Sequence, residues 1–402
     1  MTLLMKDALF SDQMLRTLGH AVYSGADVGE CLATASRIDR VDGGLWYNEW
    51  FLTAERAYAS ARASEEAGDR VGARGAYFRA SNYFRTAGLF LLEAPVPPRL
   101  VASHRREVES FRRGAALLDV PPEIIAIPYE GDALPGYFFR VADDGARRPT
   151  VILTTGYDGS VEELYFSNAA AALARGYNAL AFEGPGQGGM IIDRGIPLRP
   201  DWEAVATPVV DYALTRTDVD PARLALIGLS FGGYLAPRAV TAEHRIAACI
   251  SDGGNVDLFD VAVRRLPRLL AGRLPDGDGP SIGVLRRVLH AVMRRTTTGW
   301  AMRRNLLVHG LTDPVDYFRM AAQYTLKGRE QDIACPTLFV TADGDDLSAD
   351  IPALVARIPH VATHLRFTAE EGAADHCEGG ARALYHQRTF GWLAAVMPPA
   401  AC

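Results

Sequence analysis

The chain has 402 residues, of which 49% are apolar, enough to build a large core and more than one ordinary domain. Its formal net charge of −6 argues against nucleic acid as the main partner, and no apolar run approaches the roughly 18 residues of a membrane span. The N-terminus lacks the pattern of a signal peptide, and five scattered cysteines show neither metal-ligand spacing nor a paired framework. There is also no phosphate loop and no dinucleotide fingerprint. Composition therefore predicts a cytoplasmic globular protein without a metal, a cofactor, a nucleic-acid partner or a membrane partner.

The first part of the chain has a helical pattern. An amphipathic stretch over residues 46–67 and a return helix over residues 70–92 are separated by Gly68 and the aspartate that follows it. The return helix carries one apolar stripe at seven-residue spacing, formed by Tyr77, Phe84 and Leu91. A proline-rich segment stops this helix, and another helical stretch leads into the next domain. We predict an N-terminal helical cap domain over residues 1–115, whose aromatic residues either line a pocket or pack between the helices.

Strands and helices alternate through most of the remaining chain. A strand, a turn and a second strand over residues 124–141 are followed by alternating helices and strands to residue 396. This order is typical of an α/β fold with a mostly parallel sheet and helices on both faces. We place the core in two parts, residues 116–254 and residues 331–402.

A helical segment rich in arginine interrupts that alternation between the strands that end near residue 251 and begin near residue 336. We predict that residues 255–330 form a lid insertion over the pocket. Ten arginines between residues 264 and 304 could receive an anionic or phenolic substrate, but we expect most of them on a solvated helix face.

A short apolar strand over residues 224–229 runs into the pattern Gly228-x-Ser230-x-Gly232. This is the nucleophile elbow, in which a serine sits on a strained strand-to-helix turn and glycines allow the neighbouring backbone to approach closely. The turn exposes the hydroxyl to a base and to a substrate carbonyl. A plain strand-to-helix turn is the alternative, but the flanking strand and helix pattern favour Ser230 as a nucleophile.

A serine nucleophile needs a base and an acid that orients the base, and in this architecture they follow it in the order acid, histidine. His376 lies in a glycine-rich loop after the last predicted strand, which favours it over the other eight histidines. Three aspartates follow the strand over residues 336–341. We favour Asp345, because Gly344 lets the chain turn its carboxylate inward; Asp346 is second and Asp343, which we expect to brace the turn, is third.

The reaction also needs two backbone donors for an oxyanion. The amide after the nucleophile, that of Phe231, is one, and the loop after the strand over residues 149–155 offers the Tyr157 amide as the other. Ser160 and Glu163 have the spacing of a capping box, so Asp158 is not needed as a helix cap. We expect Asp158 to face a substrate donor or to be held protonated, with a solvated turn residue as the alternative.

These motifs resemble those of the α/β-hydrolases. They resemble more narrowly the branch that contains 2,6-dihydroxypseudooxynicotine hydrolase, the fungal pigment hydrolases that shorten polyketides, and the fermentation-respiration switch proteins. The resemblance covers most of the chain and rests on the helical N-terminus and on residues 155–159, 162–163, 182–188, 228–233 and 375–377. The chain departs from that branch at Glu183, at Ala342 and in its arginine-rich insertion.

The resemblance implies the α/β-hydrolase fold, a triad of Ser230, Asp345 and His376, and a role for Asp158 in substrate binding. It implies hydrolysis of a carbon–carbon bond next to a ketone in an aromatic or polyketide-like small molecule, as part of secondary metabolism, and it favours a homodimer. Two alternatives stay open. The same triad serves an esterase, an amidase or an acyl transferase, and the helical hairpin would also suit a regulatory binding protein.

Overall fold

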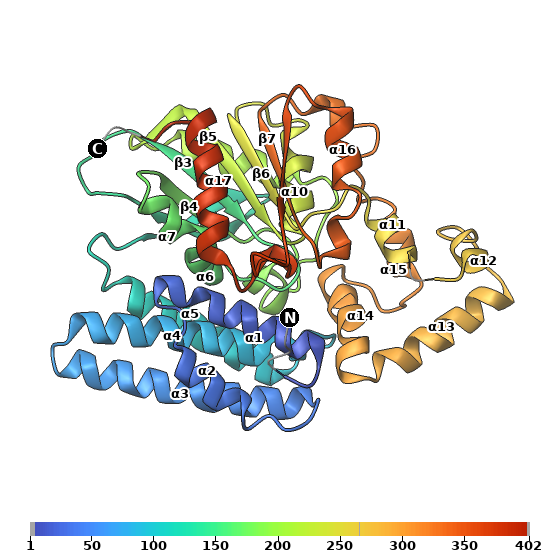
Figure 1. Ribbon diagram of the computed structural model, residues 1–402, viewed down its shortest axis with the longest axis horizontal. Coiled ribbons are helices and arrows are strands. Elements are labelled where there is room, and N and C mark those ends of the chain that lie inside the picture. The colour runs from blue at the N-terminus through green and yellow to red at the C-terminus, as the bar shows by residue number, and fades with distance from the viewer. Residues whose placement is uncertain (1–4, 265, 400–402) are drawn as a thin grey trace.

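The computed structural model describes residues 5–264 and 266–399 of the chain. Five α-helices precede the first strand and lie side by side below the rest of the molecule in Figure 1; we call them the N-terminal layer. They are α1 (Ala8–Gly19), α2 (Val28–Ala35), α3 (Gly43–Glu66), α4 (Arg70–Gly88) and α5 (Pro98–Ala115). The helices α3 and α4 form the hairpin that the sequence predicts, and α3 begins earlier than expected because the Asp42 carboxylate caps the Leu45 amide at 2.9 Å.

The aromatic residues of this hairpin form a core of their own. Four of these side chains are fully buried, namely Trp46 and Trp50 of α3 and Tyr77 and Tyr83 of α4. The Trp46 indole donates a hydrogen bond to the carbonyl of Thr86 at 2.7 Å. Packing between the helices therefore accounts for these side chains, and most of them do not line a pocket.

Eight strands form one sheet in the order β1-β2-β4-β3-β5-β6-β7-β8. The first two strands pair antiparallel with their neighbours, and the other pairs are parallel. The strands are β1 (Glu123–Tyr129), β2 (Asp132–Phe139), β3 (Arg148–Thr154), β4 (Asn178–Phe182), β5 (Val219–Leu229), β6 (Ala248–Asp252), β7 (Thr337–Ala342) and β8 (Ala362–Phe367). The mostly parallel sheet predicted from the sequence is confirmed.

Helices cover both faces of the sheet. One face packs against α9 (Glu203–Leu214), α10 (Gly232–Val240) and α16 (Ile351–Arg357). The other packs against α6 (Val161–Leu164), α7 (Ala170–Leu173) and α17 (Arg382–Val396), and Phe78 and Phe111 of the N-terminal layer join that apolar cluster. A short helix, α8 (Gly188–Ile192), follows β4. Among the described helices, none combines the length and the apolar character needed to cross a bilayer.

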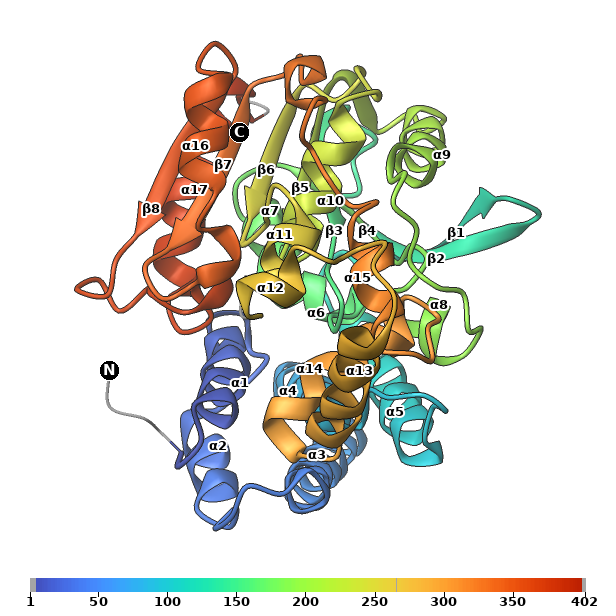
Figure 2. The ribbon, with the colours of Figure 1, turned by 90° about the vertical axis from the view of Figure 1, so that its right-hand side faces the viewer.

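The segment between β6 and β7 is helical, as predicted. It contains α11 (Leu258–Val263), α12 (Arg268–Ala271), α13 (Pro280–Met293), α14 (Thr296–Val308) and α15 (Asp316–Ala321), and we call it the inserted segment. Figure 2 shows α14 beside the N-terminal layer. The Trp300 indole of α14 donates to the Leu89 carbonyl at 2.9 Å, and Arg303 pairs with Glu93 at 2.9 Å. The inserted segment and the N-terminal layer therefore meet, although they are far apart in sequence.

Candidate active site

Ser230 follows the end of β5 directly and precedes α10. Its φ angle is 62°, in the left-handed region that a non-glycine residue adopts only where the surroundings hold it. Close packing explains why position 228 is a glycine, since a Cβ at Gly228 would lie 1.8 Å from the carbonyl oxygen of Gly232. The local backbone is that of the elbow predicted from the sequence.

The structure brings Ser230, His376 and Asp345 together. The Nε2 atom of His376 lies 2.9 Å from the Ser230 Oγ, and its Nδ1 atom lies 2.7 Å from the Asp345 Oδ2. The other oxygen of Asp345 accepts from the Leu347 amide at 3.0 Å. The His376 side chain is 37% exposed and that of Asp345 only 3%, so the histidine is open to a ligand while the carboxylate is shielded from water.

The electrostatics of this chain of contacts favour a charged His376. Burial lowers the pKa of His376, but the neighbouring Cys377 and Asp345 outweigh it and raise that pKa well above 6.5. Burial raises the pKa of Asp345, but His376 and the backbone donor outweigh it and lower that pKa below 3.8. Asp345 is therefore a carboxylate placed to stabilise an imidazolium.

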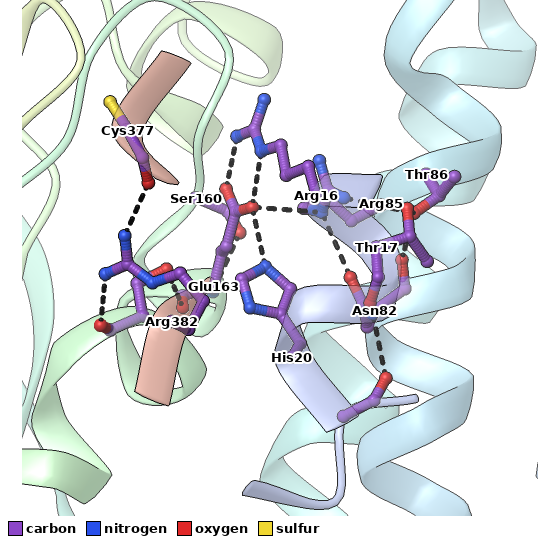
Figure 3. A network of polar contacts seen from close by, with 12 residues as sticks. Arg16, Thr17, His20, Asn82, Arg85, Thr86, Ser160, Glu163, Cys377 and Arg382 are labelled. Atoms are coloured by element: carbon purple, nitrogen blue, oxygen red, sulfur yellow. Dashed lines mark hydrogen bonds and ion pairs between the residues drawn. The ribbon is translucent and has the colours of Figure 1, made fainter. Parts of the chain in front are cut away.

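A strained turn presents His376. Cys377 and Glu378, which follow it, have φ angles of 53° and 47°. The buried Arg382 of α17 donates to the carbonyl of Cys377 at 2.8 Å and to that of Ser167 at 2.6 Å (Figure 3). These two bonds tie the turn to the core and fix the position of the histidine.

The competing candidates lie elsewhere. Asp343 pairs with Arg366 at 2.6 Å and accepts from the Ala369 amide at 3.2 Å, so it braces the turn as expected. The carbonyl of Asp346 accepts from Arg264. His364 is bonded to Thr341 at 2.9 Å on the neighbouring strand. Of the three aspartates, Asp345 is the one in contact with His376.

The loop after β3 borders Ser230. A Cβ at Gly156 would lie 2.6 Å from the Phe231 nitrogen and 3.0 Å from the Ser230 Oγ, so the backbones of the two predicted oxyanion donors are neighbours. The Tyr157 ring stacks on the Phe231 ring with 4.4 Å between centroids, and the Tyr157 hydroxyl is bonded to His309 at 2.9 Å. Aromatic rings beside Ser230 thus come from the core and from the inserted segment.

Asp158 is neither protonated nor solvated. Its Oδ1 accepts from Arg16 of α1 at 2.8 Å and its Oδ2 accepts from Arg304 of α14 at 2.5 Å, and its side chain is 9% exposed. Burial raises the pKa of Asp158, but the two guanidinium groups lower it to about 2. Two arginines remote in sequence supply the charge that favours an ionised carboxylate at this position, rather than the protonated or the solvated one that the sequence left open. Arg304 is one of the predicted minority of arginines in the inserted segment that reach the site.

Glu163 forms a buried ionic cluster with Arg16, His20 and Arg85 (Figure 3), and Arg16 also pairs with Asp158. Its amide donates to the Ser160 Oγ at 3.1 Å, which is one half of the predicted capping box. Its carboxylate does not return to the Ser160 amide but accepts from Arg16 at 2.5 and 2.7 Å and from His20 at 3.0 Å. Arg85 lies 3.5 Å away. Burial lowers the pKa of His20 to about 4, so that this histidine is neutral.

Sequence reasoning did not find Arg16, His20 or Arg85. Each lies in an ordinary helical pattern without a motif, and the contact between Arg16 and Asp158 spans 142 residues. The one signal in the sequence was Glu163, because a buried carboxylate needs a cation near it. Its position in a capping box, however, already offered an explanation for an acidic residue there.

Comparison with known proteins agrees with this geometry. Residues 151–378 match the alpha/beta hydrolase family. The 20-hydroxy-prefusarin hydrolase FUS2 of Gibberella moniliformis is 37% identical over 96% of this chain and 95% of its own length. Hydrolase LUC6 of a Fusarium species is 36% identical, over 96% of this chain and 95% of its own length.

Solved structures show the same fold. The 2,6-dihydroxy-pseudo-oxynicotine hydrolase superimposes with a TM-score of 0.73 at 21% identity, covering 94% of this chain and 95% of the other. AbyA5 superimposes with a TM-score of 0.62 at 18% identity, covering 92% and 95% of the two chains. The resemblance stated from the motifs is confirmed, and the hydrolase relatives identify the chain as an enzyme rather than a regulatory binding protein. The chain belongs to the alpha/beta hydrolase family.

Proposed function

We propose that this enzyme is a serine hydrolase in which Ser230 is the nucleophile, His376 the general base and Asp345 the acid that orients it. The observation that carries the proposal is the unbroken chain of contacts from Ser230 to His376 at 2.9 Å and from His376 to Asp345 at 2.7 Å. A hydroxyl, an imidazole and a shielded carboxylate in this order activate a serine in unrelated folds. The Tyr157 and Phe231 amides are the proposed donors to the oxyanion.

The proposed reaction is cleavage of a carbon–carbon bond next to a ketone. Ser230 Oγ bonds to the ketone carbon while His376 takes its proton, and the carbonyl oxygen becomes an oxyanion. When the oxyanion collapses, the carbon–carbon bond breaks and its electron pair leaves with a carbon that can hold it, as an enolate or an electron-rich aryl group. His376 returns the proton to that carbon. It then activates a water molecule, which hydrolyses the acyl-enzyme to a carboxylic acid and restores Ser230.

We infer an aromatic or polyketide-like small molecule of secondary metabolism as the substrate. Supporting this are the motifs shared with hydrolases of that kind and the 37% identity to a relative named 20-hydroxy-prefusarin hydrolase. We assign Asp158 to substrate positioning. Both of its oxygens already accept from arginine, so it would act by fixing Arg16 and Arg304 beside the substrate.

We also propose the N-terminal layer as the cap of the site and the inserted segment as its lid, because one arginine from each meets at Asp158. A cytoplasmic location and a homodimer stay predictions from the sequence. Light scattering coupled to size-exclusion chromatography tests the homodimer directly, since a dimer would have twice the chain mass of 43.6 kDa.

The first test is labelling with a fluorophosphonate, followed by intact-mass spectrometry and peptide mapping. We expect one adduct on Ser230, and none in Ser230→Ala. The control Ser36→Ala alters a hydroxyl at the exposed end of α2 and should label like the wild type. Folded wild-type protein that takes no label at Ser230 would contradict the nucleophile.

A second assay distinguishes a carbon leaving group from an oxygen or nitrogen leaving group. Turnover of an activated 1,3-diketone is compared with that of simple esters and amides of similar size. Faster cleavage of the diketone supports carbon–carbon hydrolysis. Cleavage of the esters or amides alone would make the enzyme an esterase or amidase with the same triad, and ester products formed with an added alcohol would indicate acyl transfer.

A further inference from the structure

A small cavity lies between the N-terminal layer and the loop after β3. Its walls are mostly apolar and come from α4, the turn after it, α5 and α8: Phe84, Leu89, Leu92, Leu100, Ile191 and Ile192. Its polar wall is formed by residues 157–160 of the loop with Arg85, His104 and Glu107. The volume is about 40 Å³. This leaves room for about three water-sized groups.

Arg85 lines this cavity and has an unused donor. Its side chain is 5% exposed. The Nε atom donates to Asn82 at 3.3 Å and the Nη2 atom donates to Thr86 at 3.1 Å. The Nη1 atom is buried, and within residues 5–264 and 266–399 it has no hydrogen-bond partner. A buried guanidinium donor without an acceptor is costly, so the position favours a ligand that supplies an acceptor.

Charged groups of both signs surround Arg85. Three guanidinium groups, those of Arg16, Arg85 and Arg304, meet two carboxylates, Asp158 and Glu163, in one connected cluster. Burial lowers the pKa of His20 to about 4 and leaves it neutral, so it does not change this balance. His104 and Glu107, which line the cavity together with Arg85, lie 3.7 Å from each other. Among these three guanidinium groups, that of Arg85 has the longest contact with a carboxylate, 3.5 Å to Glu163.

The same loop borders both the cavity and the nucleophile. Gly156 lies against Ser230, and Asp158, two residues later, lines the cavity. Two extended residues span about 7 Å at most. A group attached to the acyl part of a substrate by a chain of moderate length can therefore reach the cavity while a carbonyl lies at Ser230.

We propose that this cavity is a subsite for a carboxylate at the end of the substrate's acyl chain, bound through Nη1 of Arg85. The free donor, the positive charge of the Arg85 guanidinium and the room for one carbon and two oxygens each match a carboxylate. The apolar walls hold the carbons that lead to it. This inference rests on the proposed function, because it places the other end of the substrate at Ser230.

The test uses p-nitrophenyl half-esters of straight-chain dicarboxylic acids with 4 to 12 carbons, each paired with the same compound methylated at its free carboxyl. For wild-type protein we expect one chain length at which kcat/KM for the free acid exceeds that for the methyl ester at least ten-fold. In Arg85→Gln this ratio should fall to about one. Because the readout is a ratio of two substrates in one protein, a general loss of activity cancels.

Arg79→Gln is the matched control. Arg79 lies on the same helix as Arg85, is paired with Glu30 at 2.9 Å, and should keep the wild-type ratio. Ile192→Trp provides a second route, because it fills the cavity from the opposite wall and leaves the arginine and carboxylate cluster unchanged. It should also bring the ratio to about one, and it keeps the test decisive if Arg85→Gln fails to fold.

The outcomes distinguish failure of the carboxylate subsite from failure of the proposed serine hydrolase function. If wild-type protein neither labels at Ser230 with a fluorophosphonate nor hydrolyses any of the esters, the proposed function has failed. If it hydrolyses the esters with a ratio near one at every chain length, the carboxylate subsite is overturned and the function stands. A high ratio that survives both Arg85→Gln and Ile192→Trp overturns the subsite as well.

Discussion

The protonation state of His376 decides whether it can accept the proton of Ser230. Partial removal from water lowers the pKa of His376, but Cys377 and Asp345 outweigh this effect and raise that pKa well above 6.5. A raised pKa means that the imidazole is charged, and unable to act as a base, over a wider range of pH. We therefore expect kcat/KM to increase with pH beyond 6.5 and to level off only in the alkaline range.

Asp345→Asn should change both the pH profile of kcat/KM and the value of kcat. Loss of the carboxylate removes a charge that favours the imidazolium, so the acid limb of the pH profile should move to lower pH. The wrong tautomer of His376 should lower kcat by about 10³ to 10⁴. The measurement is a series of kcat/KM values from pH 5.5 to 10 with a chromogenic ester. Asp343→Asn, which removes a carboxylate paired with Arg366 on the same turn, is the control and should leave the profile in place. An unmoved acid limb in Asp345→Asn would contradict the role of this carboxylate.

The residues of the site differ in how far the sequence could reveal them. Ser230, Asp345 and His376 follow strands in an order that the fold requires, so short-range patterns were enough to select them. Arg16 and Arg304 contact Asp158 across 142 and 146 residues. No local pattern encodes which helix of the N-terminal layer or the inserted segment will face the loop after β3. The sequence therefore selected Asp158 but could not reveal the two arginines that pair with it.

Among the elements, α14 links the inserted segment to the N-terminal layer. Trp300 is 3% exposed, and its ring packs against Phe90 with 5.5 Å between centroids. Arg304 follows one turn later and its guanidinium lies 4.5 Å from the Trp300 ring, so the same turn of helix carries the contact to Asp158. The contact of α14 with the N-terminal layer and the position of Arg304 should thus both depend on the Trp300 side chain.

Trp300→Ala should release α14 from the N-terminal layer. Loss of a buried tryptophan costs about 3 to 5 kcal/mol, which is enough to favour local opening. We expect faster hydrogen exchange in α14 and in the loop that contains Asp158, measured by mass spectrometry, together with a higher KM. Leu269→Ala on α12 alters a side chain that is 87% exposed and should change neither. Exchange in α14 that stays at the wild-type rate would show that other contacts hold the helix.

Local signals account for most of the elements that the sequence predicted. The hairpin of α3 and α4 has a clear break at Gly68, whose φ angle of 78° ends the first helix. The strands β5 and β7 each contain an apolar run shortly before a turn. Boundaries were less accurate, since β5 begins at Val219, before its apolar run, where pairing with β3 rather than residue type decides the extent. The placement of the helical layers around the sheet depends on long-range packing and could not be derived from such signals.

On the scale of the whole molecule, buried charges join the N-terminal layer to the core. His104 of α5 lies 3.7 Å from Glu107 of the same helix and 3.6 Å from Asp193 after α8. Glu183 after β4 and Glu162 of α6 add negative charge from the core. Burial lowers the pKa of His104, but these carboxylates outweigh it and raise that pKa to about 9. Burial and the neighbouring carboxylates raise the pKa of Glu162 to about 8.

Both shifts make the fold sensitive to alkali. A histidine whose pKa is higher in the folded state binds its proton more tightly there, so its contribution is fully present below pH 6.5 and is lost as pH rises through about 9. At its largest this contribution is on the order of 3 kcal/mol. Glu162 acts in the same direction, because its proton is also held more tightly in the folded state and the free energy of unfolding falls as the pH rises from about 4.5 through about 8.

We therefore expect the urea midpoint of unfolding to fall steadily between pH 6.5 and 9.5. In His104→Gln the protein should be less stable at pH 6.5, and the decline with pH should be shallower, with the part that remains due to Glu162. His360→Gln alters an exposed histidine before β8 and should follow the wild-type curve. If His104→Gln declined as steeply as the wild type, the charge of His104 would not hold α5 against the core, and the apolar contacts of Phe78 and Phe111 would have to carry that interface alone.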